Sequence, residues 1–108
     1  MIKRMIIFNK EDVYALLAEI PCGKVVTYGQ LAEMLGSKNW ARAVGNALHS
    51  NPDGEKYPCY KVVSSNGRLS DNYAFGGLEA QKCRLEADGI KVINNAVDLK
   101  VYGIRQKN

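Results

Sequence analysis

Two helix signals joined by a glycine turn constrain the fold of this chain more than any other feature of its sequence. Thr27 and Gln30 have the spacing of a capping box, which predicts the start of a helix that ends at Gly36. A second helix is expected to begin between Ser37 and Asn39. Two helices with a short turn between them predict a helix-turn-helix, although a plain helical hairpin has the same pattern. Their apolar faces are expected to be Leu31, Met34 and Leu35 in the first helix, and Trp40, Ala41, Val44, Ala47 and Leu48 in the second.

The other predicted elements are short. Asn9 is a helix cap, and the apolar residues behind it recur at helical spacing until Pro21-Cys22-Gly23. Residues 1–7 are expected to form an edge strand or a short arm and not a signal peptide, because their apolar run is too brief. We therefore expect a single α/β domain over residues 1–108, with a winged-helix-like helix-turn-helix core. Its further elements are an extended link (25–26), a strand (60–63), a helix (78–88) and a terminal hairpin (90–93 and 97–102, split by Asn94-Asn95).

Charge and composition limit the classes of partner. The net charge of the chain is +4 and its pI is near 9.0, which favours a polyanionic partner without identifying one. No apolar run approaches the length of a membrane span, so no membrane partner is expected. The three cysteines lack C-x-x-C spacing, and one histidine, His49, does not complete a zinc set. We expect no metal, and a reduced, cytoplasmic protein.

The segment Pro58-Cys59-Tyr60-Lys61-Val62-Val63 carries the strongest chemical signal. It places Cys59 behind a rigid proline, at the start of a β-branched strand. A thiolate in that place can act as a nucleophile, whereas a buried inert thiol only lines a pocket. Tyr60 can donate a hydrogen bond but is a poor base at neutral pH, because a phenol has a pKa of about 10. Cys22 and Cys83 are expected to be structural.

Five segments in this order resemble the C-terminal, DNA-binding domain of the O6-alkylguanine-DNA alkyltransferases and of their relatives, the alkyltransferase-like proteins. The resemblance runs from about Val13 to Tyr102, which is nearly the whole chain. It rests on Ile20–Gly29, Ala41–Gly45, Asn51-Pro52, Pro58–Val63, and the closing pair Gly76-Gly77 with Arg84–Gly89.

The resemblance implies a catalytic set of four residues. Cys59 matches the alkyl acceptor, and Asn51 matches the residue that braces the turn beneath it. Tyr60 and Asp88 stand where the family has a histidine and a glutamate, which together remove the thiol proton. Both replacements weaken that proton path. Lys24, Lys61 or a helix N-terminus is then left to lower the thiol pKa.

The resemblance also implies DNA contacts. Arg42 matches the finger that fills the gap left by a flipped base, and Tyr28 matches the residue that helps to rotate the phosphate. The alternatives are a solvated helix arginine and an aromatic packed on the core. The expected DNA-binding set is Thr27, Tyr28, Arg42, Ala43, Gly45 and Lys61, and the expected lesion pocket is Tyr28, Cys59, Val62, Tyr73, Gly76 and Gly77.

What the resemblance implies for function is DNA repair by a monomer without a cofactor. The chain is expected to bind duplex DNA in its minor groove, flip O6-alkylguanine, and transfer the alkyl group to Cys59 in one turnover. The alternative is a non-catalytic protein that recognises the lesion and signals to other DNA repair proteins. A plain helix-turn-helix regulator needs base contacts in the major groove, and the small residues Ala43, Gly45 and Ala47 argue against it. The expected location is the cytoplasm, with the DNA of the nucleoid.

Overall fold

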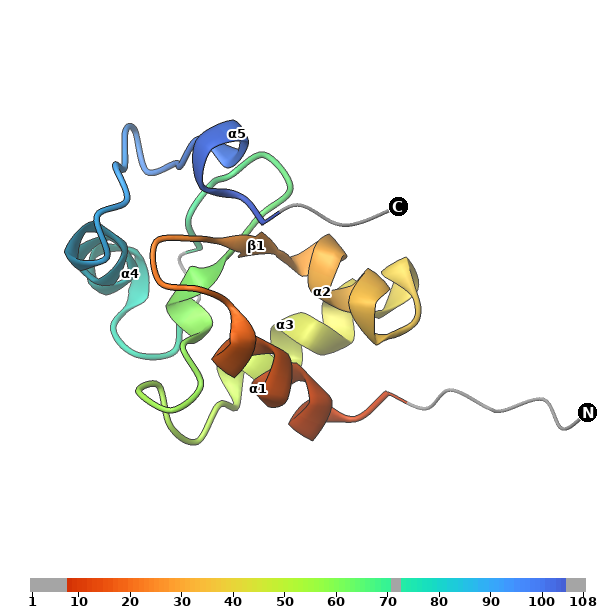
Figure 1. The fold of residues 1–108 in the computed structure, drawn as a ribbon. Coiled ribbons are helices and arrows are strands. Elements are labelled where there is room, and N and C mark those ends of the chain that lie inside the picture. Colours follow the sequence, from red (N-terminus) through yellow and green to blue (C-terminus); the bar gives the residue numbers. More distant parts are fainter. Residues whose placement is uncertain (1–7, 71–72, 105–108) are drawn as a thin grey trace, which may run out of the picture.

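The computed structural model describes residues 8–70 and 73–104. These residues form five α-helices, two 3-10 helices and one parallel pair of strands, so the predicted α/β class is confirmed. Figure 1 shows α1, α2 and α3 grouped together, with α4 and α5 lying outside this group. In chain order the elements are α1 (Lys10–Glu19), β1 (Val26–Thr27), α2 (Tyr28–Leu35), η1 (Lys38–Trp40), α3 (Ala41–His49), η2 (Cys59–Lys61), β2 (Val62–Val63), α4 (Gly77–Ala87) and α5 (Leu99–Tyr102).

The predicted helix pair forms as α2 and α3. The capping box is complete, because the Gln30 backbone N–H donates to Thr27 Oγ1 at 3.0 Å and the Thr27 N–H donates to Gln30 Oε1 at 2.9 Å. Gly36 ends α2 with a φ of 137°, a conformation that favours glycine. The segment after it forms the 3-10 turn η1 before α3 becomes regular. Met34, expected on the apolar face of α2, is instead 43% exposed.

The helix α1 completes a three-helix group with α2 and α3. Asn9 caps it, since its Oδ1 accepts from the Glu11 N–H at 2.9 Å. The apolar side of α1 buries Val13 and Leu17 completely, against α2 and α3. Burying such a side chain contributes roughly 1.5–3 kcal/mol, so this packing fixes the position of α3.

The strands join the helix pair to the cysteine segment. Val26 pairs with Val62 and Thr27 with Val63, in parallel register. The strand predicted for residues 60–63 is wrong for its first half, because residues 59–61 form the turn η2. The strand β2 begins only at Val62, and both of its residues, Val62 and Val63, are buried.

The C-terminal segment departs further from prediction. Asn94 and Asn95 form the expected turn, with φ values of 54° and 59°. The prediction of a second hairpin strand is wrong, since residues 99–102 form the helix α5. Asp98 caps that helix by accepting from the Lys100 N–H at 2.9 Å, and this local bond competes with an extended chain.

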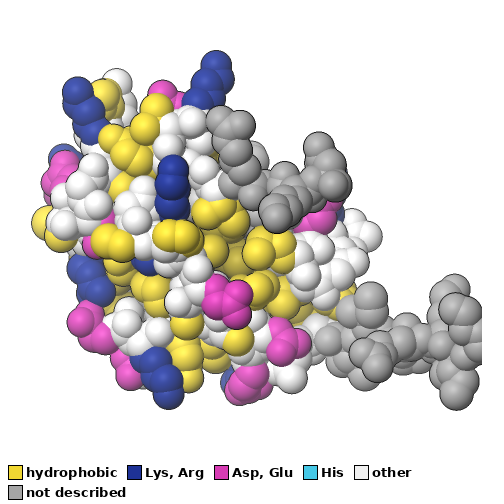
Figure 2. Space-filling model, viewed as in Figure 1, with side chains coloured by type: hydrophobic (Ala, Val, Ile, Leu, Met, Phe, Trp, Pro, Cys, Tyr) yellow, Lys and Arg dark blue, Asp and Glu magenta, His cyan; other side chains and the backbone are white. Residues whose placement is uncertain are grey.

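The expectation for residues 1–7 lies outside the described residues. Within the described part, no helix has both the length and the apolar character to cross a membrane. On the face drawn in Figure 2, Lys and Arg side chains are scattered among acidic ones, and hydrophobic side chains show between them.

Candidate active site

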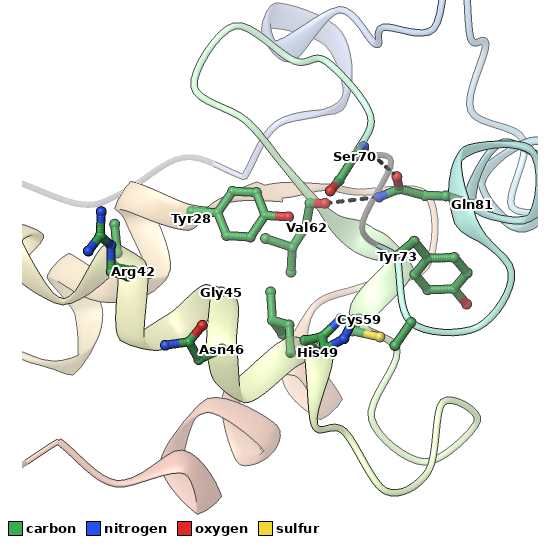
Figure 3. Close-up of a pocket in the computed structure, with 13 residues that line it drawn as sticks. Tyr28, Arg42, Gly45, Asn46, His49, Cys59, Val62, Ser70, Tyr73 and Gln81 are labelled. Atoms are coloured by element: carbon green, nitrogen blue, oxygen red, sulfur yellow. Dashed lines mark hydrogen bonds between the residues drawn. The ribbon is translucent and has the colours of Figure 1, made fainter.

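A pocket of about 610 Å³ lies between α3, η2 and the start of α4. This volume is within the range of ordinary small-molecule sites, roughly 300–1,000 Å³. Figure 3 shows side chains from these elements converging on it. The described residues that line it are Tyr28, Ala41, Arg42, Gly45, Asn46, Leu48, His49, Cys59, Val62, Ser70, Tyr73, Ala74 and Gln81.

A proline turn holds Cys59 in the pocket wall. Pro58 has φ −73° and ψ 75°, the geometry of an inverse γ-turn, and the Cys59 N–H closes that turn on the Tyr57 carbonyl at 2.7 Å. Asn51 Nδ2 donates to the same carbonyl at 2.7 Å, and Asn51 Oδ1 accepts from the Asp53 N–H at 3.0 Å. Cys59 is therefore fixed from both sides by Asn51 and Pro58.

The environment of Cys59 opposes ionisation. The side chain is only 5% exposed, and this burial raises the pKa of the thiol. A hydrogen bond from Asn51 and the charge of Arg84 lower the same pKa, but by less than burial raises it. Neither Lys24 nor Lys61 is among the groups that lower it.

Tyr60 and Asp88 form a pair, but not one that can serve as a base. The Tyr60 hydroxyl donates to Asp88 Oδ2 at 2.6 Å, so the shorter aspartate does reach the residue at position 60. Burial, and then the Asp88 carboxylate, raise the pKa of Tyr60 far above that of a free phenol. The guanidinium of Arg84 lies 4.7 Å from the Tyr60 ring centroid and pairs with Glu55 at 2.8 Å. Tyr60 is thus held as a neutral donor.

Gln81 supports the cysteine turn from α4, and the sequence analysis missed it. Its side chain is 1% exposed and donates to the Tyr60 and Val62 carbonyls at 2.9 and 3.0 Å. Its Oε1 accepts from the Ser70 N–H at 2.9 Å. A glutamine inside a polar helix gives no sequence signal for this role, which depends on the tertiary fold.

One face of α3 lines the pocket. Arg42, Gly45, Asn46 and His49 are spaced at i, i+3, i+4 and i+7, which places them on the same side of the helix. Asn46 and His49 were missing from the predicted site, although their helical spacing from Arg42 could have found them. Ala43 is half-buried and is not among the lining residues.

The structure separates the predicted pocket residues into two groups. Tyr28, Cys59, Val62 and Tyr73 lie in the pocket wall. Gly76 and Gly77 are not among its described lining residues, so their place in a lesion pocket stays a prediction. The two glycines instead begin α4 with φ values of 121° and 74°, which glycine tolerates.

Two residues expected to contact DNA have structural roles instead. Lys61 is 6% exposed, and its Nζ donates to the Ile20 carbonyl, just past the end of α1, at 2.7 Å. Thr27 is 8% exposed, and its hydroxyl caps α2. Both side chains are thus engaged within the protein, which argues against a contact with phosphate, and their contact with DNA stays a prediction.

Among the described residues, the other cysteines and acidic side chains form no second candidate site. Cys22 and Cys83, expected to be structural, are exposed free thiols outside the core. Within residues 8–70 and 73–104, no group of three or more His, Cys, Asp or Glu side chains is placed to hold a metal ion.

Comparison with known proteins identifies the family. A crystal structure of S. pombe Atl1, in complex with damaged DNA containing O6-carboxymethylguanine, has a TM-score of 0.79 and 32% identity, and the match covers 90% of this chain and 94% of that one. The DNA base-flipping protein of Vibrio parahaemolyticus is 44% identical over 81 residues, which is 75% of this chain and 79% of that protein. The bifunctional methyltransferase/endonuclease of Picrophilus torridus is 47% identical over 90 residues, and the chain spans only 30% of its length. Residues 9–90 match the family described as 6-O-methylguanine DNA methyltransferase, DNA binding domain. On these matches, the chain belongs to the family of 6-O-methylguanine DNA methyltransferase DNA-binding domains.

Proposed function

We propose that this protein binds duplex DNA through α3, receives a flipped O6-alkylguanine in the pocket, and transfers the alkyl group to Cys59. The observation that carries this proposal is the position of Cys59, in the wall of a base-sized pocket beside the exposed face of α3. Relatives with the same fold include Atl1 bound to damaged DNA and a DNA base-flipping protein, which support the DNA partner.

The face of α3 suits a minor groove. That groove is about 6 Å wide, and a helix approaches its floor only if the contacting residues are small and the duplex is bent. Ala41 and Gly45 line the pocket on this side, with Arg42 exposed between them. Arg42 is the residue we assign to the space left by the flipped base.

The transfer needs one displacement. The Cys59 sulfur, as a thiolate, attacks the alkyl carbon while the bond from that carbon to the guanine O6 breaks. The guanine leaves as an anion that takes up one proton, and the thioether on Cys59 is permanent. One protein molecule therefore repairs one lesion, which fits a monomer that needs no cofactor.

A second function, lesion sensing without transfer, is favoured by the chemistry around the thiol. Burial raises the pKa of Cys59, and Tyr60 is tied to Asp88 as a donor. A thiol that stays protonated would line the pocket, and the bound lesion would signal to other repair proteins.

The fate of the lesion separates the two functions. A duplex with one O6-methylguanine is mixed with equimolar protein, and the remaining modified base is measured after hydrolysis of the DNA. We expect stoichiometric loss of O6-methylguanine; full retention in a tight complex would instead establish the sensor.

The recognition step has its own test. On a Cys59→Ala background, which prevents transfer, Arg42→Ala is expected to reduce the preference for lesion duplex over unmodified duplex by about tenfold, as expected when one well-placed contact is lost. The matched control is Lys10→Ala, an exposed cation on α1. Equal effects of the two substitutions would contradict the role of Arg42.

We also propose that the described residues act as one domain, and that the protein works in the cytoplasm on nucleoid DNA. The three cysteines are free thiols, as a reducing compartment requires.

A further inference from the structure

We propose that His49 accepts the proton of the Cys59 thiol, directly or through one water, and so supplies the base that Tyr60 cannot be. The inference rests on the proposed transfer to Cys59. It assigns a catalytic role to the single histidine of the chain.

The fold brings His49 to the thiol. His49 is the last residue of α3, and the chain turns directly after it, with the Asn51 N–H donating to the Leu48 carbonyl at 3.2 Å. Asn51, two residues on, hydrogen-bonds the Cys59 thiol and holds its turn. His49 and Cys59 line the same pocket, which His49 reaches from α3 and Cys59 from η2 (Figure 3).

Among the described residues that line the pocket, one side chain is suited to act as a base. Among its described lining residues, those that ionise are Tyr28, Arg42, His49, Cys59 and Tyr73, and none is a carboxylate. The phenols and the guanidinium hold their protons at neutral pH, because their ordinary pKa values are about 10 or higher. An imidazole, with an ordinary pKa of about 6.5, is mostly neutral at pH 7 and can take up a proton.

The proton balance is complete without another reactant. The thiol proton passes to a ring nitrogen of His49, which leaves a thiolate beside an imidazolium. The sulfur then bonds to the alkyl carbon as the bond from that carbon to O6 breaks. The guanine anion takes one proton, from the imidazolium or from water, and His49 returns to its neutral form.

The first test is the pH dependence of transfer in a single turnover. For the wild-type protein, the rate is expected to depend only weakly on pH between neutral and alkaline conditions, because His49 takes up the thiol proton during the reaction. His49→Gln keeps a polar side chain of similar length without a base. We expect it to transfer about a hundredfold more slowly at pH 7 and to keep gaining rate far into the alkaline range, because burial raises the pKa of the thiol, which must then ionise without help.

Two further variants control the interpretation. Glu19→Gln removes an exposed titratable group on α1, outside the pocket lining, and is expected to change the transfer rate by less than about twofold. Adding Tyr60→His to His49→Gln supplies the histidine that the family has at this position and is expected to restore most of the rate at pH 7. Rescue of this kind would not follow if His49 only stabilised the end of α3.

Two outcomes would overturn the inference while the proposed function stands. One is that His49→Gln transfers the alkyl group at the same rate, and with the same pH profile, as the wild-type protein. The other is a rate loss that matches a loss of DNA affinity measured on the Cys59→Ala background, which would make His49 a phosphate contact. A wild-type protein that transfers nothing at any pH would instead overturn the proposed function.

A readout without DNA tests the same proton transfer. In a Cys22→Ser, Cys83→Ser background, only Cys59 remains to react with iodoacetamide. His49→Gln is expected to lower that rate about tenfold at pH 7 and to leave it unchanged at a pH alkaline enough to ionise the buried thiol. Equal rates at both pH values would overturn the inference even if no lesion is ever transferred.

Discussion

At the level of single residues, the neighbours Cys59, Tyr60 and Lys61 have three different surroundings. The thiol lies in the pocket wall, the phenol reaches Asp88 beyond the end of α4, and the ammonium reaches the Ile20 carbonyl. The turn η2 makes this possible, because a strand would send alternate side chains to only two faces. Three consecutive side chains thus have separate roles: Cys59 lines the pocket, Tyr60 bonds to Asp88, and Lys61 bonds to the end of α1.

Lys61 provides the test of this division. Lys61→Met keeps the length of the side chain but leaves the Ile20 carbonyl without its donor, which costs about 1–3 kcal/mol when an acceptor is buried. We expect denaturant unfolding to report that loss, with DNA affinity unchanged. Lys38→Met, at an exposed position, is the control. A weaker salt dependence of DNA binding, without loss of stability, would return Lys61 to the DNA surface.

At the level of elements, α3 packs against the core with one face and lines the pocket with another. Val44 and Ala47 are buried against the core, while the face that carries Arg42, Gly45 and His49 lines the pocket. A glycine within a helix costs about 0.5–1 kcal/mol relative to alanine, so Gly45 calls for another explanation. No atom lies within 4 Å of the place where its Cβ would be, which means that packing within the protein does not require glycine there.

Gly45→Ala is therefore expected to separate stability from binding. The free energy of unfolding should rise by about 0.5–1 kcal/mol, because alanine favours the helix. Affinity for duplex DNA should fall, because the added methyl group keeps α3 from the groove floor. Unfolding and fluorescence-anisotropy titrations measure the two effects. Affinity that stays level, or rises with stability, would show that DNA does not approach Gly45.

The helices were predictable because their signals are local. The cap at Asn9 and the capping box from Thr27 to Gln30 are each complete within four residues. The end of the chain was not predictable from apolar alternation, since the cap at Asp98 overrides it. In the site, Cys59 and Arg42 could be found from motifs. The contacts of Gln81 and Lys61 join residues about 20 to 40 positions apart, and no local pattern records them.

At the level of the whole molecule, affinity for DNA and preference for the lesion are expected to come from different features. The net charge of +4 is spread over the chain, and Figure 2 shows no single basic patch on the face that it draws. Phosphate contacts act on any duplex, whereas the pocket acts only on the flipped base. Affinity is thus expected to come largely from charge, and preference for the lesion from the pocket.

Salt separates these two contributions. On the Cys59→Ala background, the logarithm of the affinity should fall linearly with the logarithm of the salt concentration, by about 0.9 for each phosphate contact. This slope should be the same for the lesion duplex and the unmodified duplex. The ratio of the two affinities should then stay constant between about 50 and 200 mM salt. Anisotropy titrations measure both slopes. A steeper slope for the lesion duplex would mean that phosphate contacts, and not the pocket, provide selectivity.

The most direct measurement is the intact mass of the protein after incubation with a duplex that carries one O6-methylguanine. We predict a gain of one methyl group per protein molecule, located on Cys59 by peptide mapping and absent from Cys59→Ala. An unchanged mass, with the lesion still bound in the pocket, would contradict transfer and make Cys59 part of a recognition surface only.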